Sequence, residues 1–370
     1  MEKHLFAITM ALVFTTAVWG TQPNATRVFA YMPAPGQFIN ELPHITADSA
    51  ANAAIADSVL LHTNSSIYGS PMVCLGSFGG YIVMGFDHDV PNIAGSTDFK
   101  ILGNAFGNNA EPGVIMVAAD NNGNGLPDDT WYEIAGSAHD SLNTRKNYTV
   151  TYYKPTLYDD TTTAIVSQYI RWCDSRGDSG YLSKNAFHHQ SYYPAWCGDS
   201  VQFTGTRLPN NGIKQGSFVK LKSFEWGYAD NHPNNDARSE INIDWAVDSM
   251  GVATHLSSIR FVKIYTGVLQ DNGMMTGECS TEVCGAIDLH HTNDCAIASN
   301  TYLYVSTLFR TQIEVVSDRA THATLLTVSG QALREYNIAV GSNYLDACTL
   351  PAGLYLLRVD GRITKVVKAK

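Results

Sequence analysis

Apolar residues along this chain gather in short runs, and clusters of Gly, Asn, Asp and Pro separate one run from the next. Runs of this length between turn-forming residues are typical of β-strands in a sandwich or jelly roll. The clearest predicted strands cover residues 58–62, 81–86, 113–118, 148–153, 217–224, 259–265 and 302–305. We therefore predict an all-β fold, in which a large β-sandwich or jelly-roll-like domain precedes a small C-terminal β-sandwich.

Helical periodicity is weak along the whole chain. Residues 161–172 are the best candidate for one helix, and residues 243–247 are a candidate for a single turn. In the last part of the chain, strands are predicted near Tyr302, Ile313, Leu325, Asn337, Leu354 and Ile363.

The N-terminal residues predict a secretory signal peptide. Lys3 and His4 precede an apolar run over residues 5–18 that is too short to cross a bilayer comfortably, and polar residues follow Gly20. No other stretch approaches the roughly 18 apolar residues that a membrane helix requires. We expect a signal peptide at residues 1–20, a surface domain at 21–295 and a tail domain at 300–370, with no transmembrane segment in the mature protein.

Composition and charge narrow the range of partners. The formal net charge is −10 and only 16% of the residues are charged, so no basic stripe is present to engage the phosphates of a nucleic acid. Abundant Tyr, Thr, Gly and Asn fit β-rich extracellular proteins, whose strands favour aromatic and β-branched side chains.

Seven cysteines are present, and an oxidising compartment would allow some of them to pair. The natural candidates are Cys173 with Cys197, and two of the three residues Cys279, Cys284 and Cys295. The same C-terminal group together with His290 and His291 offers zinc ligands, but its spacing matches no standard zinc module. An odd number of cysteines leaves at least one of them free.

The sharpest chemical motif is a loop at residues 120–129, in which oxygen-bearing side chains recur at every second position. This alternation matches the first nine positions of an EF-hand loop, where successive ligands point at one cation. Trp131 stands where the closing Glu of an EF-hand belongs, and no helices are predicted on either side. The loop is more similar to the calcium loops of thrombospondin type-3 modules, and the alternative is an Asn-Gly-rich turn. The predicted calcium ligands are the side chains of Asp120, Asn122, Asn124, Asp128 and Asp129 and the carbonyl of Leu126.

Two weaker acidic clusters are candidates for further cation sites or for the rim of a ligand site. One is Asp87-His88-Asp89, and the other runs from residues 230–236 to Glu240, Asp244 and Asp248. In each case a solvated loop is the alternative.

Aromatic residues beside predicted loops are the candidate ligand contacts. Exposed Tyr and Trp side chains make flat platforms for sugar rings or corrin-like ligands and dominate binding hot spots. The predicted contacts are Trp131, Trp196, Trp226 and Tyr228, although most aromatic residues of a β-sandwich belong to its core.

Catalytic motifs are missing from the sequence. It contains no Gly-x-Ser-x-Gly elbow, no His-Glu-x-x-His helix, no phosphate-binding P-loop and no dinucleotide fingerprint after a strand. A glycosidase needs two carboxylates about 5–10 Å apart. Glu111, Glu133, Glu225 and Glu240 are conceivable members of such a pair, but the sequence alone does not place them in space.

The C-terminal segment carries a resemblance that is specific in order and position. Ser329-Gly330-Gln331 is followed by the run LPAGLYLLRV at residues 350–359 and by the basic end KVVKAK at 365–370. This order closely resembles the C-terminal sorting domain of the type IX secretion system of the Bacteroidetes. The resemblance implies that the type IX secretion machinery is a partner, and that the protein crosses the outer membrane through the periplasm and is secreted or held at the cell surface.

A second resemblance covers residues 31–289. The segments that carry it, in order, lie at residues 35–38, 107–113, 120–133, 152–155, 205–209, 224–228, 243–248, 261–267 and 277–283. They are similar to a family of Bacteroidetes "cell surface proteins", often encoded near outer-membrane nutrient uptake systems, some of them for cobalamin. The resemblance implies a binding role and supplies no catalytic residue.

Together these features predict a secreted or surface-attached, calcium-stabilised β-sandwich that binds a nutrient or a glycan and is not an enzyme. A calcium-dependent carbohydrate-active enzyme is the first alternative, and it would need paired carboxylates in a cleft. An adhesin or structural surface protein is the second, and it would present a flat surface without a pocket.

Overall fold

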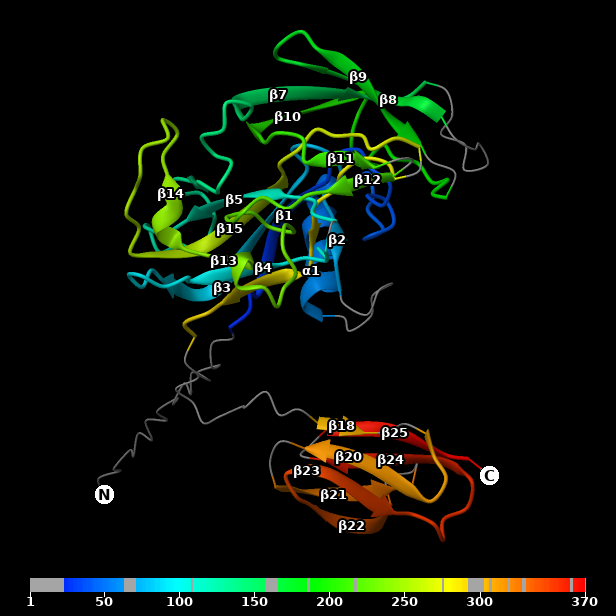
Figure 1. Cartoon of the computed structure of the whole chain (residues 1–370). Helices are drawn as coiled ribbons and strands as arrows, with labels where there is room; N and C mark the ends of the chain where they lie inside the picture. The colour runs from blue at the N-terminus through cyan, green and yellow to red at the C-terminus, as the bar shows by residue number, and fades with distance from the viewer. Residues whose placement is uncertain are drawn as a thin grey trace, which may run out of the picture. The chain divides into compact units, whose positions relative to one another are not determined.

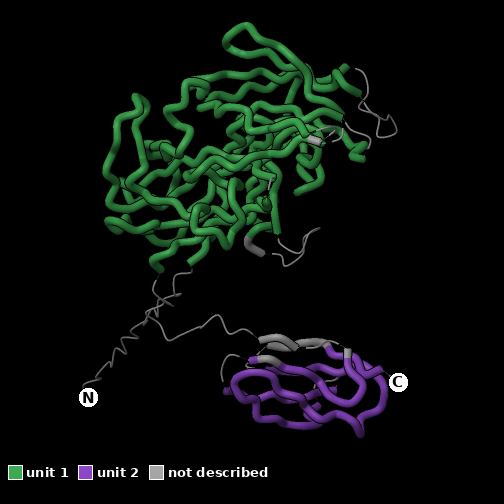
Figure 2. Tube along the Cα trace, viewed as in Figure 1, with its two compact units in different colours: residues 1–292 green, residues 293–370 purple. Residues whose placement is uncertain are grey.

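The computed structural model describes residues 23–62, 71–107, 109–156, 166–184, 187–215, 218–274, 276–291, 303–305, 308–317, 320–327, 331–359 and 362–369. The chain divides into two compact units, residues 1–292 and 293–370 (Figure 2). It is nearly all β, with 45% strand and 6% helix, which confirms the predicted all-β class. The predicted signal peptide at 1–20 and the predicted domain boundary at 295–300 lie outside the described residues. No helix in the described part of the chain is long and apolar enough to span a membrane.

A six-stranded antiparallel sheet forms the centre of the first unit (Figure 1). Its order is β1 (Arg27–Met32), β3 (Tyr81–Pro91), β15 (Ser258–Thr266), β5 (Gly113–Ala118), β6 (Tyr132–Ile134) and β14 (Ala246–Val247). The predicted strands at 81–86, 113–118 and 259–265 are therefore present, and they are neighbours in the middle of this sheet.

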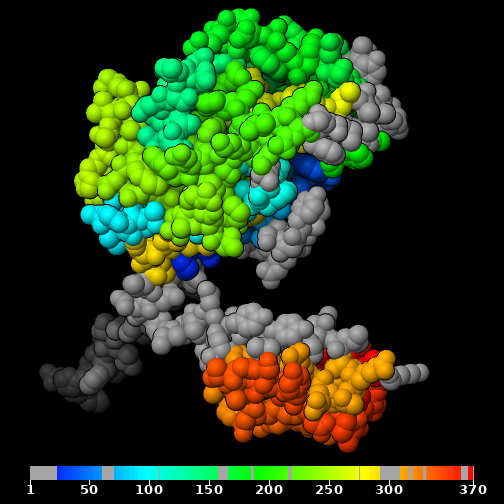
Figure 3. Space-filling model, viewed as in Figure 1, coloured from blue at the N-terminus to red at the C-terminus, as the bar shows by residue number. Residues whose placement is uncertain are grey.

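A four-stranded antiparallel sheet lies beside it, drawn in green at the top of Figure 1. Its order is β10 (Ser200–Arg207), β7 (Arg145–Tyr153), β8 (Val166–Asp174) and β9 (Ser179–Lys184). The helix predicted at residues 161–172 is wrong, because the described part of that segment is strand β8. In the space-filling view the green middle part of the chain forms much of the visible face of the first unit (Figure 3).

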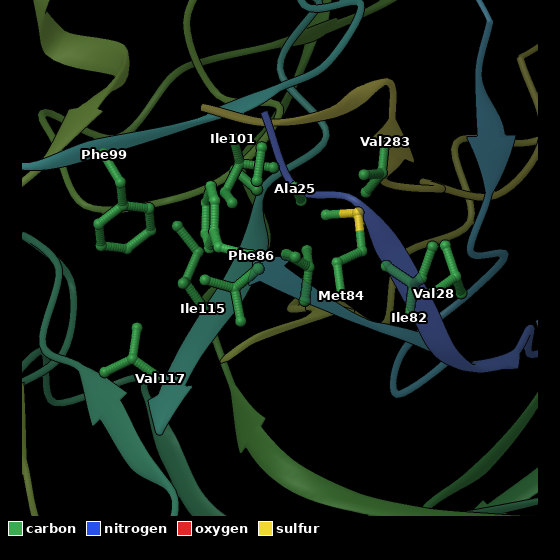
Figure 4. Close-up of a cluster of buried hydrophobic side chains, with 14 of the residues drawn as sticks. Ala25, Val28, Ile82, Met84, Phe86, Phe99, Ile101, Ile115, Val117 and Val283 are labelled. Carbon is green, nitrogen blue, oxygen red and sulfur yellow. The ribbon is translucent and has the colours of Figure 1, made fainter. Parts of the chain in front are cut away.

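Apolar side chains on both faces of the six-stranded sheet are buried, because successive residues of a strand point to opposite faces. On β5, Val114 and Met116 pack into the cluster that contains Tyr148 and Tyr152 of the four-stranded sheet. Ile115 and the other alternate residues join a second cluster on the opposite face. Figure 4 shows this second cluster, in which Ile115 and Val117 lie with Ile82, Met84, Phe86, Phe99 and Ile101.

A helix and several short strands complete the first unit. Helix α1 (Ser49–His62) follows Asp48, whose carboxylate accepts the Ala50 N–H in the manner of an N-cap, and it packs against β1 with Ala56 and Leu60 buried. The strand predicted at 58–62 is therefore wrong. The remaining elements are β2 (Val73–Cys74) with β16 (Glu282–Val283); β13 (Glu240–Ile241), β4 (Phe99–Leu102) and β17 (Gly285–Asp288); β11 (Gly212–Gln215) with β12 (Phe218–Leu221); and the 3-10 turns η1 (Ala237–Ser239) and η2 (Ile243–Trp245).

The second unit contains two sheets around its own apolar core, which includes Ile313, Leu325 and Leu357. One sheet is β18 (Leu303–Val305), β20 (Gln312–Ser317) and β23 (Gly341–Asp346). The other is β19 (Leu308–Phe309), β25 (Arg362–Lys368), β24 (Gly353–Val359), β21 (Thr321–Leu326) and β22 (Ala332–Ile338). Strands β19 and β23 were not predicted.

Candidate functional site

A pocket of about 560 Å³ opens in the first unit. Its walls come from the loop after β1, from β2 and the residue before it, from the segment between β4 and β5, from His188 between β9 and β10, and from the segment after β15. The acidic lining residues are Glu111, Glu278 and Glu282, and the larger apolar ones are Phe38, Leu42, Met72 and Phe106. Among the described residues that line it, none is a Lys or an Arg.

The segment from Glu278 to Cys284 supplies one wall of the pocket, because every second side chain of the segment faces the pocket. Its backbone is extended, and Glu282 pairs with Cys74 of β2. Extended backbone places every second side chain on one face. The residues that line the pocket are accordingly Glu278, Ser280, Glu282 and Cys284, whereas Cys279, Thr281 and Val283 point the other way and are fully buried.

Asp230 lies behind this wall and is anchored by backbone donors. Its Oδ1 accepts the N–H groups of Asn104 (2.9 Å) and Ala105 (2.8 Å), and its Oδ2 accepts that of Glu282 (3.0 Å). One oxygen from each of Asp230, Glu111 and Glu282 lies within 4.8 Å of the other two. Asp230 therefore holds the loops of the pocket together and brings a third carboxyl group to the two that line it.

Burial makes this carboxyl cluster hard to ionise. Loss of solvent raises the pKa of Glu111 to about 8 and raises that of Glu282 well above its ordinary value, and the neighbouring carboxylates add to both shifts. The same burial raises the pKa of Asp230 to about 7, while its three N–H donors oppose the rise. The N–H donors therefore favour the ionised form of Asp230, whereas burial and the neighbouring carboxylates favour the protonated forms of Glu111 and Glu282.

Glu278 has a different environment from the other three acids. Its Oε1 accepts the Gln37 N–H at 2.6 Å, and Gly36 has no room for a side chain because a Cβ there would lie 2.6 Å from the same oxygen. Its Oε2 is buried and has no hydrogen-bond partner. Burial raises the pKa of Glu278 to about 7. One wall of the pocket therefore carries a buried acceptor atom that the protein itself leaves unused.

The remaining polar groups of the pocket are neutral at physiological pH. Burial raises the pKa of Cys74 well above its ordinary value and that of Cys284 to about 12, so both remain thiols and are poor nucleophiles. Burial also lowers the pKa of His188, whose ring packs edge-on against Phe38 with centroids 4.3 Å apart. Phe106 at the pocket is 63% exposed and offers an apolar surface to a ligand.

The predicted calcium loop folds back on itself through its alternating side chains. The Asp120 carboxylate accepts the N–H groups of Asn124 (3.0 Å) and Gly125 (2.9 Å), and positive φ angles at Gly123 and Gly125 allow the turn. The side chains of Asn122 and Asn124 accept the N–H groups of Asn124 and Leu126, two positions further along.

The closing acids of this loop meet its opening residues. Asp128 accepts the carboxamide N–H groups of Asn122 (3.1 Å) and Asn124 (3.0 Å), and these hydrogen bonds lower its pKa. Asp129 accepts the Asn121 N–H at 3.2 Å. The side chains of the five predicted ligand residues thus lie in one small loop. Arg260 Nη1 lies 3.7 Å from Asp120 Oδ2, and its positive charge opposes a cation at that end.

The four predicted aromatic contacts are not among the residues that line the pocket. Tyr228 is 3% exposed and its hydroxyl accepts the Ala138 N–H at 3.1 Å, so it is a core residue and no surface platform. Trp196 is part-buried and donates to the Pro33 carbonyl, and Trp226 packs against Trp245 with ring centroids 4.4 Å apart. Trp131 is half-buried next to the calcium loop.

The cysteines of the described residues are all free thiols. The proposed pair Cys173–Cys197 is not formed, and Cys173 Sγ lies 3.1 Å from the Tyr153 hydroxyl instead. Cys295, a candidate for a second pair, lies outside the described residues.

Comparisons with known proteins add little to this geometry. No family model matches the chain, and no curated protein is similar to it in sequence. Among solved structures, a Faecalibacterium prausnitzii beta-glucuronidase is similar over 74% of this chain at 12% identity, with a TM-score of 0.15. The chain spans about half the length of that protein, 46%. A TM-score this low carries no argument about fold or activity.

Proposed function

We propose that the first unit is a binding domain whose pocket takes a small ligand bearing an amino group or several hydroxyl groups. The observation that carries this proposal is the unpartnered Oε2 of Glu278, buried at the wall of the pocket. A buried acceptor without a partner costs about 1–3 kcal/mol, and a donor on the ligand would remove that cost. The pocket volume, about 560 Å³, lies in the range of about 300–1,000 Å³ that small-molecule sites occupy.

The chemistry of the lining selects among ligands. A cationic amine would stabilise the ionised form of Glu278 and of the carboxyl cluster, because an opposite charge nearby favours ionisation. An anionic ligand would lie next to carboxyl groups, which repel it when they are ionised. The described lining residues include no Lys or Arg to offset that repulsion. Phe106 and Phe38 would contact the apolar face of a sugar ring or an alkyl chain. Amino sugars and other amine-bearing or polyhydroxylated nutrients fit this lining best.

Isothermal titration calorimetry tests the proposal with a panel of amino sugars, neutral oligosaccharides, polyamines and matched anionic sugars. Glu278→Gln should weaken binding of the preferred member at least tenfold, because the amide carries no charge and one of its two acceptors becomes a donor. Glu225→Gln is the matched control, since Glu225 is exposed and does not line the pocket. Equal affinity in the wild-type protein and the Glu278 variant, or preference for the anionic sugars, would refute the proposal.

A glycoside hydrolase is the second candidate, because Glu278 and Glu111 share one pocket and both have pKa values raised toward neutrality. A carboxyl group that keeps its proton near pH 7 is what a general acid requires. Release of chromophore from aryl glycosides by the wild-type protein, and its loss in both Glu278→Gln and Glu111→Gln, would favour this candidate over simple binding.

Calcium binding at residues 120–129 and export by the type IX secretion machinery complete the proposed function. In the loop, the Asn122 and Asn124 side chains and the Asp120 and Asp128 carboxylates supply the oxygen ligands that calcium prefers. Calcium would stabilise the turn that follows β5. The second unit, whose C-terminal strands carry the sorting-domain resemblance, would direct the protein to the cell surface or the medium.

A further inference from the structure

A cluster of two histidines and one aspartate lies outside the acidic pocket. His88 is on β3, Asp288 ends β17, and His291 follows three residues later as the last residue of the first unit that the structure describes. One ligand atom of each lies within 4.8 Å of the other two. The His88 and His291 rings have centroids 4.9 Å apart.

Local backbone irregularity brings His88 to this position. The pairing of β3 with β15 shifts register between Val90 opposite Ile259 and Gly85 opposite Phe261, so residues 86–89 bulge away from the sheet. Bulges of this kind re-aim side chains and are common next to functional sites. Arg260 holds the bulge in place, because its Nη2 donates to the Asp87 carbonyl at 2.6 Å.

Both ring nitrogens of His88 face a carboxylate oxygen. Its Nδ1 lies 2.7 Å from Asp87 Oδ1, and its Nε2 lies 3.0 Å from Asp288 Oδ2. A neutral imidazole has a single N–H and serves only one of these two carboxylates. Either a second proton or a metal ion between Nε2 and Asp288 satisfies both contacts.

The surroundings favour the metal ion over the proton. Asp288 is 2% exposed and its Oδ1 accepts the His290 N–H at 2.7 Å, which leaves Oδ2 directed at His88. His291 brings a third ligand, and a second nitrogen, close to His88 and Asp288, which a second proton would not need. The contact of Asp87 with Nδ1 is the carboxylate–histidine arrangement that fixes the ring of most metal-binding histidines.

We propose that His88, Asp288 and His291 bind a divalent transition-metal ion of the zinc type. Two imidazoles and one carboxylate suit zinc and its first-row neighbours, whereas calcium and magnesium prefer an all-oxygen set. The 3.0 Å between His88 Nε2 and Asp288 Oδ2 is close to the roughly 3.3 Å that separates two ligands of tetrahedral zinc. One ligand atom of His291 lies within 4.8 Å of a ligand atom of each of these two residues. Three protein ligands leave one position for water, as in zinc sites that act on substrates.

Cobalt(II) titration of the full metal-stripped chain tests the site, because the visible bands of cobalt in a four- or five-coordinate protein site are far stronger than the weak absorption of the aqueous ion. We expect one equivalent of cobalt to produce these bands and one equivalent of zinc to abolish them. His291→Ala and His88→Ala should each weaken cobalt binding by about a hundredfold or more, and Asp87→Asn by about tenfold because Asp87 only orients His88.

His255→Ala is the matched control, since its side chain is 80% exposed and contacts only Asp244 among the interactions that the structure records. This variant should bind cobalt as the wild-type protein does. If His88→Ala fails to fold, the His291 variant decides, because His291 is part-exposed at the end of the described unit. Absorption that stays that of the aqueous ion, or bands that survive in the His291 variant, would overturn the proposal.

Discussion

Replacing Glu278 by Gln should change how the stability of the first unit depends on pH. Burial raises the pKa of Glu278 from its ordinary value of 4.5 to about 7. The folded state therefore holds a proton more tightly than the unfolded chain does. This contribution to stability is complete below pH 4.5 and is lost as the pH rises through about 7.

The size of the effect follows from the rise in pKa. Each tenfold change in proton affinity corresponds to about 1.4 kcal/mol, so the rise to about 7 corresponds to about 3 kcal/mol. Gln has no proton to lose, and its carbonyl still accepts the Gln37 N–H. When the pH is raised from 4.5 to 8, we expect the wild-type protein to lose about 3 kcal/mol of unfolding free energy that the variant keeps.

Urea unfolding at several pH values, followed by tryptophan fluorescence, measures this difference. All six tryptophans precede residue 293, so the signal reports the first unit and not the second. Glu225→Gln is the control and should give curves parallel to the wild type at every pH, because Glu225 is exposed. A free-energy difference for Glu278→Gln that stays constant from pH 4.5 to pH 8 would show that Glu278 titrates normally and would refute the reasoning.

Four further outcomes are expected. Calcium at a hundredfold excess over its dissociation constant should add about 2.7 kcal/mol to the unfolding free energy, measured by thermal denaturation, and Asp120→Asn should abolish the gain. Phe106→Ala should weaken the pocket ligand about tenfold in calorimetry, because it removes exposed apolar contact area. Tyr228→Phe should lower the unfolding free energy by about 1–3 kcal/mol in urea, because the buried Ala138 N–H loses its acceptor. Deletion of residues 300–370 should retain the protein in the periplasm of a type IX-secreting host, measured by fractionation and immunoblotting.

Each of these has a direct control. Asp140→Asn is the control for calcium: it removes a carboxylate that is 98% exposed and should leave the stabilisation by calcium intact. Stabilisation by calcium that persists in Asp120→Asn would contradict the loop as the calcium site. Phe106→Ala should keep the wild-type melting temperature. An unchanged unfolding free energy in Tyr228→Phe would contradict its structural role. Full-length protein must reach the surface in the same host for the deletion to be informative, and secretion of the truncated chain would contradict the role of the tail.

Strands with an uninterrupted apolar run could be predicted from the sequence, and the helix could not. Residues 113–118 are apolar without interruption because both faces of the central sheet are covered; Pro112 precedes them, and the loop that begins at Asp120 follows. Helix α1 has an Ala-rich sequence that lacks a distinct apolar stripe, so its run Val-Leu-Leu resembled a strand. In residues 166–174, strand pairing with β7 and β9 outweighs the local helical spacing.

The candidate site was harder to predict because its members are far apart in sequence. Glu111 and Asp230 come from two separate loops and Glu282 begins β16, and only the folded chain brings the three together. In the sequence, Glu278, Ser280 and Glu282 alternate with apolar or small residues. This alternation is typical of an extended segment with its polar side chains on one face. His88 and His291 lie about two hundred residues apart. The sequence therefore grouped His88 only with Asp87 and Asp89, and His291 only with the nearby cysteines and His290.

The order of strands in the central sheet bears on how this chain is made. β15 lies between β3 and β5, yet it is encoded after both of them. The chain near Ala25, at the start of the unit, also bonds to Ala286, near its end. For a chain that emerges from a ribosome or a translocation channel N-terminus first, the sheet stays open until residue 266 has arrived. Such late, long-range closure slows folding, because the chain between β5 and β15 must be brought together before their contacts can form.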